Sequence, residues 1–167
     1  MLKDFYAAFA PVCFTLLGLW LIVVQTRHAE WRWSSLHRRR AYAVSLHFSL
    51  PGLMSLLSLV DSTSTSLWRV SFAIIAGGGA VVLVAVRGPA PGRLGAVAFV
   101  VAVVLYAIIA LVAIAPSSAH VLGHSVRALR VEAVLLSGIV FLGANVAWLL
   151  LFENTEVLPP EPVDAAI

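Results

Sequence analysis

Five long apolar runs dominate the sequence, and short polar stretches separate them. We place the runs at residues 5–25, 41–60, 67–86, 94–115 and 131–152. A helix needs about 20 predominantly apolar residues to cross the hydrocarbon core of a bilayer, so each run is long enough to span. The pattern predicts an all-α, polytopic membrane protein with a bundle of five transmembrane helices over residues 1–152. The remaining residues, 153–167, are acidic and proline-containing, and we expect a flexible cytoplasmic tail.

The distribution of basic residues between the runs predicts the orientation of the bundle. Five of the eleven Lys and Arg residues fall in the stretch 27–40, RHAEWRWSSLHRRR, and Arg87 and Arg93 flank the third connection. Short cytoplasmic loops of membrane proteins carry an excess of Lys and Arg. We therefore expect the first and third connections inside, the N-terminus outside and the C-terminus in the cytoplasm.

The same stretch, 27–40, interleaves arginine with tryptophan. Tryptophan prefers the headgroup level of a membrane, and arginine neutralises lipid phosphate there. We predict that this stretch lies on the membrane surface as an interfacial anchor, and the alternative is a basic loop that binds a ligand or a partner. The candidate residues for lipid or partner binding are Arg32, Arg38, Arg39, Arg40, Trp31 and Trp33.

Composition supports a membrane location and limits the classes of partner that we expect. The chain is 61% hydrophobic and only 11% charged, whereas soluble proteins are roughly 45–50% apolar and about 25% charged. The net charge of +3 comes from residues next to apolar runs, which favours anionic lipid over nucleic acid. We expect a multi-pass protein of the cell membrane whose partners are lipids, further copies of itself and, as an open alternative, another membrane protein.

The second run is the most polar and holds the chemically richest residues. An ionisable group at membrane depth is expensive and marks a functional site by default, although a packed structural histidine is the alternative for His47. Pro51 stands four residues after His47 and should remove the usual donor to its carbonyl. An amide such as Asn145 either joins two helices or lines a path. The pore or ligand candidates are Ser45, His47, Ser49, Ser55 and Asn145.

The sequence offers little for metal binding or catalysis. His120 and His124 have the i, i+4 spacing of a helical metal site, but no third ligand lies nearby in sequence, so they are weak candidates. Glu132 lies close to Arg127 and Arg130 and is most simply an interfacial ion pair. The motifs GxSxG and HExxH are absent. We predict no cofactor and no enzymatic activity.

Two functional hypotheses follow from these residues. The first is a homo-oligomeric channel or passive transporter for an anion or small solute, with the polar second run lining the path. The second is a non-enzymatic accessory or scaffold membrane protein that binds lipid or a partner protein through the arginine-rich stretch. The two differ in whether the serines of the second run face water or a dry helix contact.

Overall fold

The computed structural model describes residues 2–60, 65–88, 92–116 and 128–152, and all of its regular structure in these ranges is helical. The helices are α1 (Leu2–Thr26), α2 (His28–Trp31), α3 (Ser35–Val60), α4 (Thr65–Ala85), α5 (Gly92–Ile114) and α6 (Ala128–Leu151). All except the four-residue α2 are long and apolar enough to cross a membrane. The prediction of a helical protein with five candidate spans is therefore confirmed.

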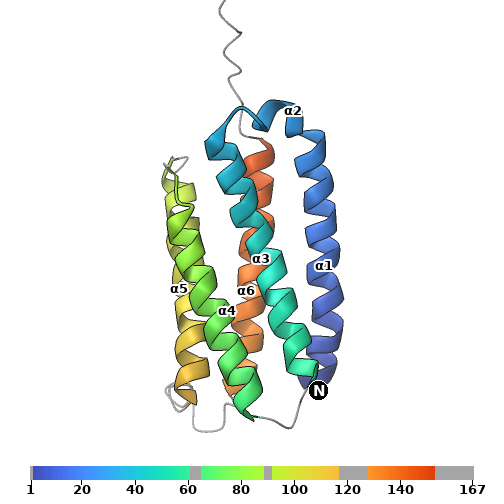
Figure 1. The fold of residues 1–167 in the computed structure, drawn as a ribbon, viewed down its shortest axis with the longest axis vertical. Helices are drawn as coiled ribbons and strands as arrows, with labels where there is room; N and C mark the ends of the chain where they lie inside the picture. Colours follow the sequence, from blue (N-terminus) through green and yellow to red (C-terminus); the bar gives the residue numbers. More distant parts are fainter. Residues whose placement is uncertain (1, 61–64, 89–91, 117–127, 153–167) are drawn as a thin grey trace, which may run out of the picture.

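The long helices form an up-and-down bundle in which the chain reverses direction at each connection (Figure 1). The short α2, the beginning of α3, the end of α4 and the end of α6 all lie at one end of the bundle, and the N-terminus lies at the other. We call the first the arginine-rich end, because residues 27–40 and Arg87 lie there. The bundle itself does not assign either end to a side of the membrane.

The helix α3 occupies the middle of the bundle and packs against α1, α4 and α6. The helix α5 packs against α4 and α6. Its link to α3 is the long side chain of Tyr106, whose buried hydroxyl donates to the Leu46 carbonyl oxygen at 3.1 Å.

Glycines allow the closest helix approaches. A Cβ added at Gly143 of α6 would lie 2.5 Å from the Cβ of His47, and one added at Gly79 of α4 would lie 2.6 Å from Leu50 Cδ1. Real Cβ atoms essentially never approach another heavy atom this closely, so α3 can touch α6 at this point only because Gly143 lacks a side chain. At Gly79 the nearby atom is the end of the flexible Leu50 side chain, which can move. In contrast, a Cβ at Gly77 would meet nothing within 4 Å.

Helix α3 begins at Ser35, six residues before the apolar run from which it was predicted. The extra turns are polar in sequence but buried on one side, where His37 contacts Trp31. An apolar run marks the part of a helix that crosses the hydrocarbon, whereas the helix itself continues as far as its contacts reach. The apolar pattern alone therefore could not place this boundary.

Candidate functional site

A cavity of about 420 Å³ opens among α3, α4, α5 and α6 near the arginine-rich end. Most of its wall is apolar and comes from three helices and the segments that follow them. These apolar residues include Leu83 and Val86 of α4, Leu94, Phe99 and Ala102 of α5, and Val146, Leu149, Leu150 and Phe152 at the end of α6. This wall suits a hydrocarbon chain or another apolar group.

Three arginines line the same cavity. Arg39 and Arg40 come from the first turns of α3, and Arg87 follows the end of α4. The Arg87 guanidinium lies 4.8 Å from the centre of the Phe99 ring, a cation–π contact that holds it beside the apolar wall. Among the described residues, no Asp or Glu lines the cavity. The site therefore combines positive charge at one end with an apolar interior.

His47 lines the cavity about 10 Å further along α3 than Arg40, given seven residues at the helical rise. It is only 4% exposed, and its Nδ1 lies 2.6 Å from the Ala43 carbonyl oxygen. A carbonyl oxygen only accepts, so Nδ1 carries the proton, and Nε2 of the neutral ring is an acceptor. No described residue pairs with Nε2, and the neighbouring Tyr106 hydroxyl already donates to Leu46.

The other candidates of the second run do not line the cavity. Ser45 donates to the Ala41 carbonyl oxygen at 3.1 Å, and the fully buried Ser55 donates to that of Pro51 at 2.8 Å. Each hydroxyl proton is thus used within α3 itself, a common solution for serine in an apolar helix. Ser49 is half-buried and lies outside the cavity lining.

Asn145 lies on an exposed surface of α6 and not on the cavity side. Its Nδ2 donates to the Phe141 carbonyl oxygen at 2.7 Å. Of the five pore or ligand candidates, the structure therefore brings only His47 to the cavity, while Asn145 faces away from the bundle.

The arginine-rich stretch separates into a packed part and an exposed part. Trp31 is 2% exposed and its ring stacks on His37, whereas Trp33 is 77% exposed with the Arg32 guanidinium 4.5 Å from its ring centre. Arg38 donates to the Arg32 carbonyl oxygen. Arg39 and Arg40 are the members that reach the cavity.

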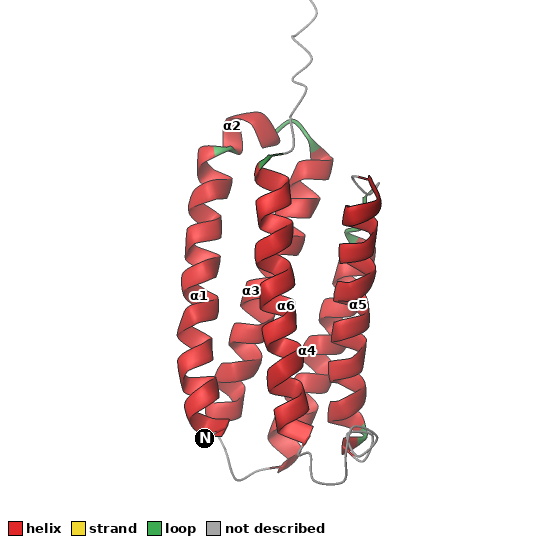
Figure 2. Ribbon diagram, turned by 180° about the vertical axis from the view of Figure 1, so that it is seen from behind, coloured by secondary structure: helices red, strands yellow, loops and turns green. Residues whose placement is uncertain are grey.

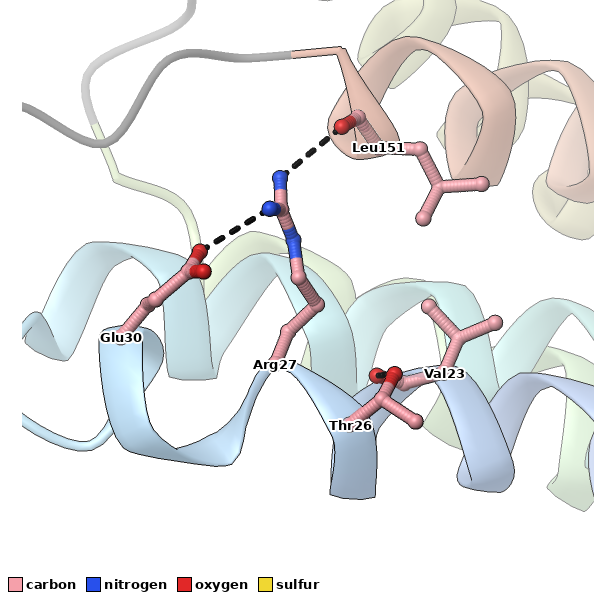
Figure 3. Close-up of polar contacts among 5 residues, drawn as sticks. All are labelled: Val23, Thr26, Arg27, Glu30 and Leu151. Atoms are coloured by element: carbon pink, nitrogen blue, oxygen red, sulfur yellow. Dashed lines mark hydrogen bonds and ion pairs between the residues drawn. The ribbon is translucent and has the colours of Figure 1, made fainter.

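Arg27 ties the same stretch to the end of α6. Its Nη2 donates to the Leu151 carbonyl oxygen at 3.0 Å, and its Nη1 pairs with Glu30 at 3.0 Å (Figure 3). The last carbonyls of a helix have no partner within the helix, so a cation there satisfies them and complements the helix dipole. This contact positions the end of α6, whose last residues form part of the cavity wall.

Glu132 is not at the surface, and its expected ion pair with Arg130 is wrong; Arg127, the other expected partner, lies outside the described residues. Glu132 lies in the second turn of α6 and is fully buried, and neither of its side-chain oxygens has a hydrogen-bond partner among the described residues. The side chain is on the interior face of α6, close to where the Tyr6 hydroxyl donates to the Leu129 carbonyl oxygen at 3.0 Å. Proximity in sequence to Arg130, which is exposed, did not place the two groups on the same face.

The weak metal candidates, His120 and His124, lie outside the described residues. Within the part of the chain that the structure describes, no group of three or more His, Cys, Asp or Glu side chains is placed to hold a metal ion. Sequence reasoning missed Arg87 and Phe99 as site residues. The only signal was the position of Arg87 directly after an apolar run, which by itself also fits a topology signal.

No protein-family model matches this chain, and no curated protein or solved structure is significantly similar to it. The fold and the five apolar helices define the class, a helical multi-pass membrane protein. Function must be argued from the cavity and its residues.

Proposed function

We propose that this protein is a non-enzymatic accessory membrane protein that binds an anionic lipid in the cavity at its arginine-rich end. The observation that carries the proposal is the combination of three arginines and an apolar wall in one cavity. An anionic lipid has the matching arrangement, a negative headgroup joined to hydrocarbon chains. The arginine-rich stretch of the sequence predicts lipid binding at its surface, and we place the lipid in the cavity instead.

The chemistry of the two parts supports this ligand. Guanidinium groups bind phosphate oxygens through paired, charge-assisted hydrogen bonds, and Arg39, Arg40 and Arg87 approach from two helix ends. The apolar residues of α5 and α6 then contact the acyl chains, where burial contributes about 0.8 kcal/mol per methylene. A small soluble anion would use the arginines alone, so the apolar wall favours a lipid.

The test uses native mass spectrometry of protein released from nanodiscs that contain equal amounts of phosphatidylglycerol and phosphatidylcholine. The wild-type chain should retain phosphatidylglycerol preferentially. The triple variant Arg39→Gln, Arg40→Gln, Arg87→Gln should lose that preference at least tenfold, because each charged contact to phosphate contributes about 1 kcal/mol or more.

A matched triple variant, Arg32→Gln, Arg38→Gln, Arg93→Gln, removes the same charge from residues that do not line the cavity. It should retain phosphatidylglycerol like the wild type. Equal loss of preference in both triple variants would mean that general surface charge, and not the cavity, attracts the lipid. That result would overturn the proposal.

A second candidate is the channel or passive transporter for an anion or small solute. One observation favours it, namely that His47 lines the cavity and that its Nε2, well inside the bundle, pairs with no residue in the described ranges. This hypothesis expects flux in liposomes that His47→Ala changes. Flux no greater than that of empty liposomes, across several ion gradients, would remove it.

The remaining sequence predictions belong to the same proposal. We infer that the arginine-rich end faces the cytoplasm of a cell membrane, because basic connections and anionic lipid headgroups both concentrate there. Cysteine accessibility at Trp33→Cys, which is on an exposed position of that end, tests the orientation in sealed vesicles.

A further inference from the structure

One stripe of α6 faces away from the bundle along almost the whole helix. The alternation of four-residue and three-residue steps keeps its members on one narrow face, as in the seam of a coiled coil. The helix lies uncovered between α1 and α5 when the bundle is seen from behind (Figure 2). We call these residues the α6 stripe: Val134, Gly138, Phe141, Asn145 and Trp148.

The large members of the α6 stripe are open to the surroundings of the single chain. Val134, Phe141 and Trp148 are each at least 63% exposed. A Cβ added at Gly138 would meet only Leu105 Cδ1, at the ordinary contact distance of 3.8 Å. Gly138 thus leaves a gap on the helix surface between the larger side chains of Val134 and Phe141, where another helix can approach closely.

Asn145 sets this face apart from an ordinary lipid-facing surface. It lies six residues before the end of α6, about 9 Å along the axis, so a helix that spans the bilayer holds it in hydrocarbon. Its Nδ2 uses one proton on the Phe141 carbonyl oxygen, and a carboxamide has a second N–H and a carbonyl oxygen as well. Leaving these groups in lipid without partners is costly.

We propose that the α6 stripe is the interface of a parallel homodimer, in which Asn145 pairs with Asn145 of a second copy. Two copies inserted the same way in a membrane are related by an axis along the membrane normal, so equivalent residues of α6 meet at that axis. A carboxamide is both donor and acceptor and is therefore complementary to itself. The heptad-like spacing and Gly138 provide the close packing that the pair needs.

The first test is disulfide cross-linking in native membranes. In a Cys13→Ala background, which removes the buried native thiol, Phe141→Cys and Trp148→Cys should each give a covalent dimer on oxidation. Val104→Cys, on the exposed surface of α5, is the matched control and should remain monomeric. Equal cross-linking at all three positions would indicate random collision and overturn the proposal.

The second test measures the role of the amide. Förster transfer between labelled copies, followed as the protein-to-lipid ratio falls, gives the dimer dissociation constant in liposomes. Asn145→Leu should weaken the dimer about tenfold and Asn145→Gln should retain most of it, because an interhelical amide bond in a membrane is modest but specific. A dissociation constant unchanged by Asn145→Leu would overturn the assignment of this residue. Neither test depends on lipid in the cavity.

Discussion

At both ends of the bundle an arginine side chain donates to the last carbonyls of a helix, but the two ends differ in what lies between the helices. At the arginine-rich end, Arg27 donates to the Leu151 carbonyl oxygen of α6. At the opposite end, Arg69 donates to the carbonyl oxygens of Ala113 and Ile114 of α5, at 3.0 and 2.6 Å. Both contacts satisfy carbonyls that a helix cannot pair by itself.

In the interior of the opposite end, large side chains close the space between the helices. Tyr6 of α1 and Phe72 of α4 meet edge to face with their ring centres 6.5 Å apart, and Ile109 and Leu136 complete the same buried cluster. The arginine-rich end instead has the cavity among α3, α4, α5 and α6. A hollow of about 370 Å³ beside Leu2, Phe5 and Arg130 also lies at the opposite end, but it is more open to the surroundings. The arginine-rich end therefore has the more enclosed space and three arginines for a ligand, whereas the opposite end has the packed side chains.

The ionisable side chains of the bundle therefore lie in two kinds of surroundings. Arg39 and Arg87 line a cavity that a ligand can enter, whereas Glu132 is enclosed by packed helices with no described partner. A buried ionic group without a partner lowers stability. The following substitutions separate the packed contacts from the cavity, beginning with the largest expected effect.

Gly143→Ala should break the contact between the central helix α3 and α6. The new methyl group would lie 2.5 Å from the Cβ of His47, so the helices must move apart at a cost of about 3 kcal/mol. Unfolding by sodium dodecyl sulfate in mild detergent, followed by circular dichroism, measures this loss. Gly77→Ala, which meets nothing within 4 Å, should leave stability unchanged or raise it. Equal effects at the two positions would contradict the close approach.

Arg69→Gln should destabilise the closed end by about 2 kcal/mol, because two charge-assisted bonds to the end of α5 are lost. The measurement is the same unfolding titration, with Arg130→Gln as the control because Arg130 is exposed at that end. Lipid selectivity should not change in either variant. A selective loss of phosphatidylglycerol in Arg69→Gln would remove the distinction between the ends.

Glu132→Gln should raise stability by about 1 kcal/mol. The amide has nearly the shape of the carboxyl group and cannot ionise. It therefore removes the cost of either holding a charge or keeping a proton at a fully buried position with no described partner. Thermal unfolding at neutral pH checks the sign. The half-exposed Glu30, which pairs with Arg27, is the comparison, and Glu30→Gln should be neutral or slightly destabilising. A clear loss of stability in Glu132→Gln would mean that the carboxylate has a partner.

Tyr106→Phe should cost the least, about 0.5–1 kcal/mol, because it removes one buried hydrogen bond to Leu46 and keeps the ring. Tyr42→Phe, at an exposed position, should cost nothing measurable. If Tyr106 sets the separation of α3 and α5, Tyr106→Phe should also change lipid retention while Tyr42→Phe does not. Unaltered stability and retention in both variants would exclude that role.

The sequence predicted the five spans because the length of an apolar run is a direct measure of what a bilayer requires. It did not predict the cavity, which forms among α3, α4, α5 and α6 and depends on how these helices pack around one another. It also could not show that Ser45 and Ser55 bond to their own helix, since this choice depends on side-chain rotation.

Faces of helices were equally hard to assign from the sequence. Trp31 and Trp33 are two residues apart, and both lie beside arginines in the sequence. Trp31 is nevertheless packed against His37, whereas Trp33 is exposed. Burial here depends on how α2 turns the chain between α1 and α3, and turn geometry has no clear signal in this stretch. Glu132 and Arg130 differ for the same reason, because two residues along a helix point in different directions.

Photo-cross-linking tests the central claim most directly. Phosphatidylglycerol with a diazirine in its acyl chain is added to wild-type protein in nanodiscs, and the labelled positions are mapped by mass spectrometry. We expect label concentrated in residues 94–102 of α5 and in residues 146–152 at the end of α6, and we expect it to be lost in the triple variant of Arg39, Arg40 and Arg87. Label spread evenly over the exposed faces of all helices, unchanged in that variant, would contradict a lipid site in the cavity.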